Sequence, residues 1–220
     1  MNNRLFAIGD IHGCFNSFKK LIEEKIQITK SDKVVLLGDY IDRGSQSKEV
    51  IDYIIELKGQ GFEIISLKGN HEEMLLDAYD DEKLASKWIL NGGNETLKSF
   101  GISSLTKLEP KYLDFFRNLK LFFELEDYLF VHAGFNDEIE NPFSDSYHMI
   151  WKCREKYTHS FLRAKTVIHG HCVIPSITCD DRIKNNNPVI NLDTGCVYSN
   201  RSSLGRLTSL EIYTRTIHFV

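Results

Sequence analysis

Three apolar runs in the first third of the chain are each followed by a glycine and a polar residue. They cover residues 5–8, 34–37 and 62–67, and the pairs that follow are Gly9-Asp10, Gly38-Asp39 and Gly69-Asn70. The polar residues lie 29 and 31 positions apart, about one strand–helix–strand repeat. Apolar residues at helical spacing separate the runs, so the pattern predicts a βαβαβ unit with both faces of its sheet covered. We therefore expect Asp10, Asp39 and Asn70 at one sheet edge, where open α/β folds bind ligands.

The remaining two thirds of the chain predict helices first and strands afterwards. Helical patterns cover residues 72–79, 82–90, 95–100 and 110–119, with a break at 91–94, and strand patterns cover residues 121–125, 128–132, 166–169, 189–192, 207–213 and 216–220. Residues 125–128 are typical of a hairpin turn, and residues 180–188 are typical of a polar loop. We expect a single domain over residues 1–220, of the α/β (α+β) class, in which two sheets pack together with helices outside.

Charge and hydropathy argue against several classes of protein. The 220 residues carry 27 lysines and arginines against 31 aspartates and glutamates, and a pI near 6.1 indicates no basic surface for nucleic acid. No stretch approaches the ~20 apolar residues of a membrane helix. The apolar run near the start is too short for the core of a signal peptide. The sequence predicts a cytoplasmic protein with neither a nucleic-acid nor a membrane partner, and we expect a monomer.

The cysteines show no reactive motif. The chain has five, namely Cys14, Cys153, Cys172, Cys179 and Cys196, and none lies in a C-x-x-C pair. None is followed at the sixth position by the arginine of a Cys-x5-Arg phosphatase loop. Because no export signal is present, we expect reduced thiols that are buried or incidental.

Histidines gather at five strand-end motifs. Two of these motifs are His132-Ala133-Gly134 and His169-Gly170-His171, and together the five motifs hold five of the eight histidines. Each motif alone is typical of a turn or of a buried, hydrogen-bonded histidine. Burying so many ionisable groups together is costly unless a cation compensates them. Oxygen and nitrogen ligands without thiolate suit Mn²⁺, Fe or Zn²⁺, so the set predicts a metal site.

The five motifs resemble a known family. GDIHG, GDYIDRG, GNHE, HAG and HGH, in this order, are similar to the motifs of metallophosphoesterases of the PPP-type phosphoprotein phosphatase family. The short chain looks most like the compact bacterial and phage serine/threonine phosphatases. The resemblance implies a central β-sandwich of mixed sheets flanked by helices, with two divalent cations at one edge. Mn²⁺ is the first choice for these cations, and Fe or Zn²⁺ are alternatives.

The resemblance also implies a role for each motif residue. Asp10 and His12 would hold the first metal, Asp39 would bridge, and Asn70, His132 and His171 would hold the second metal. His71 would be the general acid, oriented by Asp42, and Arg43 would bind the phosphate oxygens. Arg154, in a stretch one residue longer than the family's Trp-x-Arg-Glu, is the candidate for a second phosphate contact, with Arg163 or Arg182 as alternatives. His169 and Asp193 are expected to support the site rather than to bind metal.

The implied reaction is hydrolysis of phosphoserine and phosphothreonine monoesters, with phosphotyrosine as a further substrate, by direct attack of a metal-bridging hydroxide. The partner would then be a phosphoprotein or a small phosphoester. A dinucleoside polyphosphate hydrolase, acting for instance on diadenosine tetraphosphate, is the alternative because it would use the same dinuclear site. A non-catalytic metal-binding module is disfavoured because His71, Asp42 and Arg43 are all present.

Overall fold

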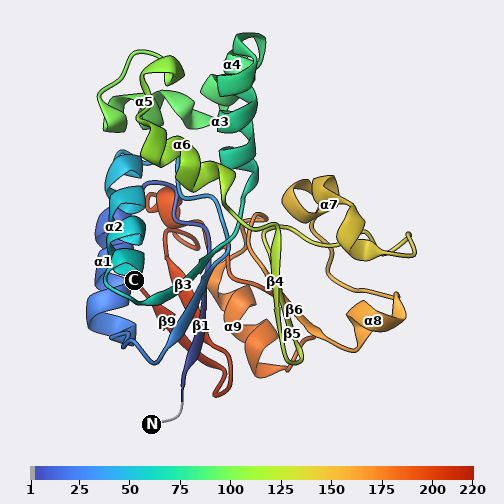
Figure 1. The fold of residues 1–220 in the computed structure, drawn as a ribbon. Coiled ribbons are helices and arrows are strands. Elements are labelled where there is room, and N and C mark those ends of the chain that lie inside the picture. The colour runs from blue at the N-terminus through green and yellow to red at the C-terminus, as the bar shows by residue number, and fades with distance from the viewer. Residues whose placement is uncertain (1–2) are drawn as a thin grey trace.

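The computed structural model describes residues 3–220 and contains two β-sheets packed face to face (Figure 1). The first sheet has the order β3-β2-β1-β8-β9, with the strands Glu63–Ser66, Lys33–Leu36, Leu5–Ile8, Thr208–Glu211 and Thr216–Phe219. The second has the order β4-β5-β6-β7, with the strands Phe122–Leu125, Tyr128–Val131, Thr166–His169 and Val189–Asn191. Strands β1–β3 are mutually parallel, as are β5–β7, whereas β4, β8 and β9 are antiparallel to their neighbours. This mixed α/β arrangement confirms the predicted fold class.

Strand β1 shows why the two sheets pack together. Its side chains alternate between the two faces, as in any strand, and all four are buried. Leu5 and Ala7 join the core between the sheets, which also contains Phe130 and Ile168 of the second sheet. Phe6 and Ile8 point the other way, into the core beneath the helices. The unbroken apolar run at residues 5–8 therefore indicates a strand that is covered on both faces.

The helices cover the outer faces of the sandwich and one of its ends. In chain order they are α1 (Phe15–Lys20), η1 (Leu21–Ile26), α2 (Ser47–Gly59), α3 (Asn70–Asp80), η2 (Glu82–Leu84), α4 (Ala85–Trp88), η3 (Ile89–Gly93), α5 (Asn94–Phe100), η4 (Leu105–Lys107), α6 (Pro110–Arg117), η5 (Pro142–Ser144), α7 (Ser146–Trp151), α8 (Ser160–Arg163), α9 (Ser176–Lys184) and η6 (Cys196–Tyr198). Figure 1 shows α3–α6 grouped at the upper end of the molecule, and α7 and α8 beside the second sheet. Within residues 3–220, every helix is too short or too polar to span a bilayer.

The nine predicted strands all have counterparts in the described part of the chain, with ends that differ by up to two residues. The hairpin is also confirmed, because Leu125 pairs antiparallel with Tyr128. The predicted polar loop at residues 180–188 is wrong in its first half, since α9 continues to Lys184. Cys179 and Ile183 bury one side of this helix in the core between the sheets. The residues between them are polar and lie on the other face, so the sequence of this segment shows no clear helical periodicity.

The predicted break at residues 91–94 is a kink rather than an end. The chain passes from α4 through η3 into α5 without leaving helical geometry, except at Gly92, whose φ is 108°. A left-handed φ of this kind carries little steric cost for glycine. A kink at Gly92 therefore separates two helices within this segment.

Candidate active site

The predicted functional side chains converge where the two sheets meet. Asp10, Asp39 and Asn70 follow β1, β2 and β3, while His132 and His171 follow β5 and β6. All of them are at most 5% exposed except His171, which is half-buried. The site is therefore assembled from both sheets, and the parallel strands deliver their carboxyl ends to one edge as expected.

Backbone strain marks the same edge. Five of the predicted site residues have left-handed φ angles, namely His12 at 44°, Asp39 at 52°, Asp42 at 69°, Arg43 at 68° and His171 at 67°. Each such angle costs a non-glycine residue about 1–2 kcal/mol and persists only where surrounding contacts impose it. These turns direct the side chains back over the strand ends.

One set of ligand atoms, the His132 group, consists of Asn70, His132 and His171. His132 Nε2 lies 3.1 Å from Asn70 Oδ1 and 3.2 Å from His171 Nδ1, and the latter two atoms are 2.9 Å apart. His132 Nδ1 donates to the Leu37 carbonyl at 2.8 Å. Engaging the other ring nitrogen in this way fixes the ring orientation of a metal-binding histidine.

The protonation state of the His132 group is suited to binding a cation. Burial is the main reason that the pKa of His132 lies below its usual value and that of His171 falls to about 4. Both imidazoles are then neutral, so the lone pair of His132 Nε2 faces the Asn70 oxygen. A divalent cation would remove this repulsion, and these are the nitrogen and oxygen donors that such cations accept.

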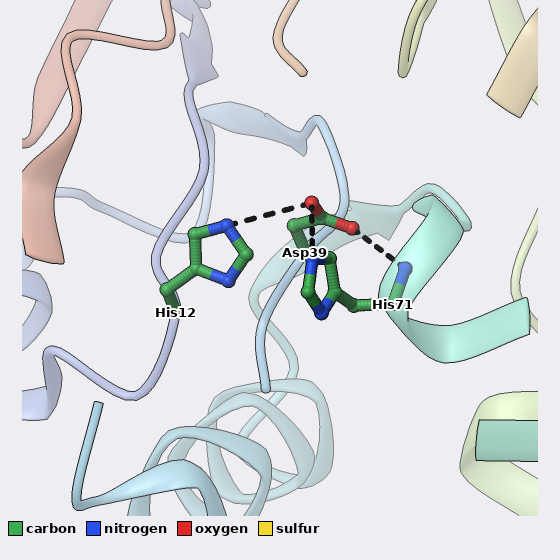
Figure 2. Close-up of side chains that lie close together, drawn as sticks. All are labelled: His12, Asp39 and His71. Carbon is green, nitrogen blue, oxygen red and sulfur yellow. Dashed lines mark hydrogen bonds and ion pairs between the residues drawn. The ribbon is translucent and has the colours of Figure 1, made fainter. Parts of the chain in front are cut away.

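A second set, the His12 group, consists of His12, Asp39 and His71, whose ligand atoms lie within 4.8 Å of one another (Figure 2). Asp39 Oδ2 lies 3.5 Å from His12 Nε2 and 3.9 Å from His71 Nε2. Asp39 Oδ1 lies 3.5 Å from His132 Nε2. The two oxygens of Asp39 thus face different groups, the arrangement expected of a carboxylate shared by two cations.

The electrostatics around Asp39 favour its anion. Burial alone would raise the pKa of this carboxyl, but His132, His71 and His12 together hold it below its usual range. Burial also lowers the pKa of His12 to about 3, and its Nδ1 donates to the Ile41 carbonyl at 2.9 Å. His12 therefore presents the lone pair of Nε2 to the site.

Asp10 lies beside the His12 group but outside its tight set of ligand atoms. Its oxygens accept the backbone N–H of His171 at 3.2 and 3.1 Å. Burial, and then the nearby carboxylates of Asp193 and Asp39, raise the pKa of Asp10 well above its usual value. Such crowded buried carboxylates are costly as anions, and a cation would stabilise them. A side chain at Gly170 would collide with the Asp10 carboxylate, so this position requires glycine.

His71 and Asp42 form a buried pair. His71 Nδ1 donates to Asp42 Oδ2 at 2.7 Å, and neither side chain is exposed. His71 Nε2 is buried without a hydrogen-bond partner among the described residues and faces Asp39 and His12 (Figure 2). Burial lowers the pKa of His71, but Asp39 and Asp42 outweigh it and raise the pKa overall. The free nitrogen can therefore carry a proton toward a molecule bound at the sheet edge where the predicted metal ligands converge, which we call the ligand edge.

The side chains of the two predicted phosphate-binding arginines have different partners. Arg43 is half-buried, and its Nη1 donates to His12 Nε2 at 2.7 Å, so its guanidinium lies at the ligand edge. Arg154 instead donates to Glu138 Oε1 at 2.6 Å. The alternative Arg182 is paired with Glu155 in the same way, at 2.5 Å. Among the hydrogen bonds of the described residues, Arg43 is thus the one of these three that contacts a predicted metal ligand.

Sequence reasoning missed the structural role of Glu72, although it is the last residue of the GNHE motif. Its buried carboxylate accepts the backbone N–H groups of Asp39, Tyr40 and Gly69 at 2.9, 2.8 and 3.0 Å. Burial raises the pKa of Glu72 to about 8. Glu72 thereby joins the turn after β2 to the start of α3 and fixes Asp39 relative to His71.

The expectation of five reduced thiols is wrong, because Cys153 and Cys172 form a disulfide. The loops after α7 and β6 meet there, with Cα atoms 6.6 Å apart, next to the buried His169. The absence of an export signal and the spacing of the cysteines are the sequence features that predict reduced thiols. Neither feature indicates that these two loops meet in the fold. Cys14, Cys179 and Cys196 are free, and the last two are buried as expected.

Residues 4–193 match the calcineurin-like phosphoesterase family, so the chain belongs to that family. It is 34% identical to serine/threonine-protein phosphatase 1 of Salmonella typhimurium, over 41% of this chain and only 39% of that relative's length. It is 24% identical to an asymmetrical bis(5'-nucleosyl)-tetraphosphatase of Anoxybacillus flavithermus, over 92% of this chain and 88% of the relative. A cold-active protein tyrosine phosphatase of a Shewanella species shares the fold, with a TM-score of 0.65 and 17% identity over 100% of this chain and 80% of that one.

Family membership identifies residues 4–193 as a calcineurin-like phosphoesterase domain. The two groups around Asp39 are able to bind metal ions. The bacterial phosphatase relative supports the resemblance to phosphoprotein phosphatases, while the tetraphosphatase relative keeps the alternative substrate open. The choice of substrate therefore depends on features beyond the shared motifs.

Proposed function

We propose that the protein hydrolyses phosphate monoesters with two divalent cations, one held by Asp10, His12 and Asp39 and the other by Asp39, Asn70, His132 and His171. Such cations lower the pKa of water and neutralise phosphate charge when bound. The observation that carries this proposal is Asp39, whose two oxygens face separate groups of nitrogen ligands. Mn²⁺ remains our first choice for both positions.

The other side chains of the edge supply proton transfer and phosphate binding. His71 Nε2 would donate a proton to the leaving oxygen, while Asp42 holds Nδ1 and so fixes the ring. The guanidinium of Arg43 would bind phosphoryl oxygens, for which its planar fork is suited. With cations bound, water would serve as the nucleophile, so no serine or cysteine nucleophile is required.

For the substrate, we propose phosphoserine and phosphothreonine in proteins. An open depression of about 420 Å³ lies beside Arg43, lined also by Leu90, Asn91, Gly92, Val197 and Tyr198. Its openness suits a phosphate that is carried on a protein surface. The local similarity to the Salmonella phosphatase, at 34% identity, supports the same proposal.

A dinucleoside tetraphosphate is the second candidate substrate. It is favoured because the Anoxybacillus tetraphosphatase aligns with 92% of this chain, whereas the Salmonella phosphatase aligns with 41%. Measuring kcat/KM of the manganese-loaded protein on a phosphothreonine peptide and on diadenosine tetraphosphate separates the two. We expect the peptide to be the better substrate. A clear preference for the dinucleotide would overturn the protein phosphatase proposal, and inactivity on both and on p-nitrophenyl phosphate would overturn the phosphoesterase proposal.

A further inference from the structure

The segment that contains α4, η3 and α5 packs against the residue that orients the proposed acid. This segment, residues 85–100, lies at the upper end of the molecule in Figure 1. Trp88 and Thr96 point inward from it, and each is 1% exposed. They lie 46 and 54 residues from Asp42 in sequence, so only the fold brings the three together.

Both residues donate hydrogen bonds to the Asp42 carboxylate. Trp88 Nε1 lies 2.9 Å from Oδ2 and 3.1 Å from Oδ1. Thr96 Oγ1 donates to Oδ1 at 2.6 Å and accepts the backbone N–H of Asp42 at 2.9 Å. Together with His71 at 2.7 Å, these donors engage both carboxylate oxygens. Two of the three side chains that fix the plane of the carboxylate, Trp88 and Thr96, therefore lie outside the five sequence motifs.

The glycines of this segment make the contacts possible. A side chain at Gly93 would overlap the indole of Trp88. The Gly92 carbonyl accepts the backbone N–H of Arg43 at 3.4 Å. The segment thus contacts the backbone of the proposed phosphate-binding residue and the side chain of its neighbour, Asp42.

We propose that Trp88 and Thr96 are positioning residues for proton transfer: they hold the Asp42 carboxylate so that His71 keeps Nε2 directed at the leaving oxygen. This inference rests on the proposed phosphoesterase activity. Neither residue touches the substrate or the cations. A carboxylate without these donors could rotate about its Cβ–Cγ bond, and the imidazole that it holds would follow.

The test is the dependence of kcat on the leaving group in a matched pair of variants. Thr96→Val removes the hydroxyl at nearly constant volume, whereas Thr96→Ser keeps the hydroxyl and removes a methyl group. A phosphothreonine peptide releases a poor leaving group that needs a proton, and p-nitrophenyl phosphate releases one that does not. We expect Thr96→Val to lower kcat on the peptide by ~10–100-fold, part of the ~10²–10⁴-fold that a general acid supplies. On p-nitrophenyl phosphate we expect a loss of less than about 3-fold, because protonation contributes little there.

Rescue by serine and an independent signal complete the test. Thr96→Ser should keep the leaving-group dependence of the wild type, with unchanged metal content. Trp88→Phe should resemble Thr96→Val, and it serves as the second variant if valine prevents folding. In zinc-loaded protein, the proton NMR signal of the His71 Nδ1–H should shift in Thr96→Val and not in Thr96→Ser.

Equal losses on both substrates, or no loss on the peptide, would overturn the inference. So would an unshifted His71 signal in folded Thr96→Val. Inactive wild-type protein would instead contradict the proposed function, so the two failures are distinguishable.

Discussion

The two ligand groups on either side of Asp39 differ in what their surroundings allow them to do. In the His132 group, two neutral imidazoles and an amide oxygen lie together, and His132 Nδ1 donates to the Leu37 carbonyl. The His12 group includes the imidazole of His71, whose pKa is raised, and it adjoins the carboxylate of Asp10 and the guanidinium of Arg43. The first arrangement is suited to holding a cation, whereas the second can also move a proton and bind phosphate. The proposed chemistry is therefore asymmetric about Asp39.

The largest effect should come from the residue that the groups share. Asp39→Asn removes the charge that faces both groups, so we expect both cations to be lost and activity to fall by roughly 10³-fold or more, since bound cations supply several kcal/mol of stabilisation. Elemental analysis and turnover on p-nitrophenyl phosphate measure these effects. One cation fully retained with normal turnover would show that Asp39 does not bridge.

A smaller effect, confined to one side, should come from the proposed acid. His71→Asn should keep both cations and lower kcat by the ~10²–10⁴-fold of a general acid. Because His71 Nε2 belongs to the tight His12 group, metal content decides between two roles. If this variant loses a cation, then His71 is a ligand and the asymmetry between the groups is smaller than proposed.

The smallest effect should come from Arg154. It is paired with Glu138, which is 78% exposed, and such surface pairs contribute about 0–1 kcal/mol. We expect Arg154→Ala to change kcat/KM by less than about 3-fold, within that range of energies. Arg43→Ala is the matched comparison and should lower kcat/KM by much more than Arg154→Ala does. Equal damage from both variants would mean that Arg154 reaches the phosphate during turnover.

The ligand edge could be predicted from the sequence because its signal is local. Asp10, Asp39 and Asn70 each follow an apolar run, and parallel strands must bring such positions together. The resemblance then assigned a role to each residue. The geometry places most of these residues together, while Asp10 lies at the margin of the tight set.

Other parts of the site depend on distant contacts that no local pattern reports. Trp88 and Thr96 reach Asp42 from another part of the chain, and Cys153 meets Cys172 only where two loops cross. Arg154 lies in a stretch one residue longer than the family's Trp-x-Arg-Glu, and the rotamer that pairs it with Glu138 depends on the fold of its loop. Helix α9 was missed because its buried face consists of only Cys179 and Ile183.

The ligands proposed for the second cation come from both sheets, and this division links metal supply to folding. Asp39 and Asn70 follow strands of the first sheet, and His132 and His171 follow strands of the second. A cation bound between them would hold the two sheets together and add about 2.7 kcal/mol to the unfolding free energy at a free metal concentration of 100 times Kd. Scarcity of metal would then shorten the lifetime of the folded chain as well as slow its chemistry.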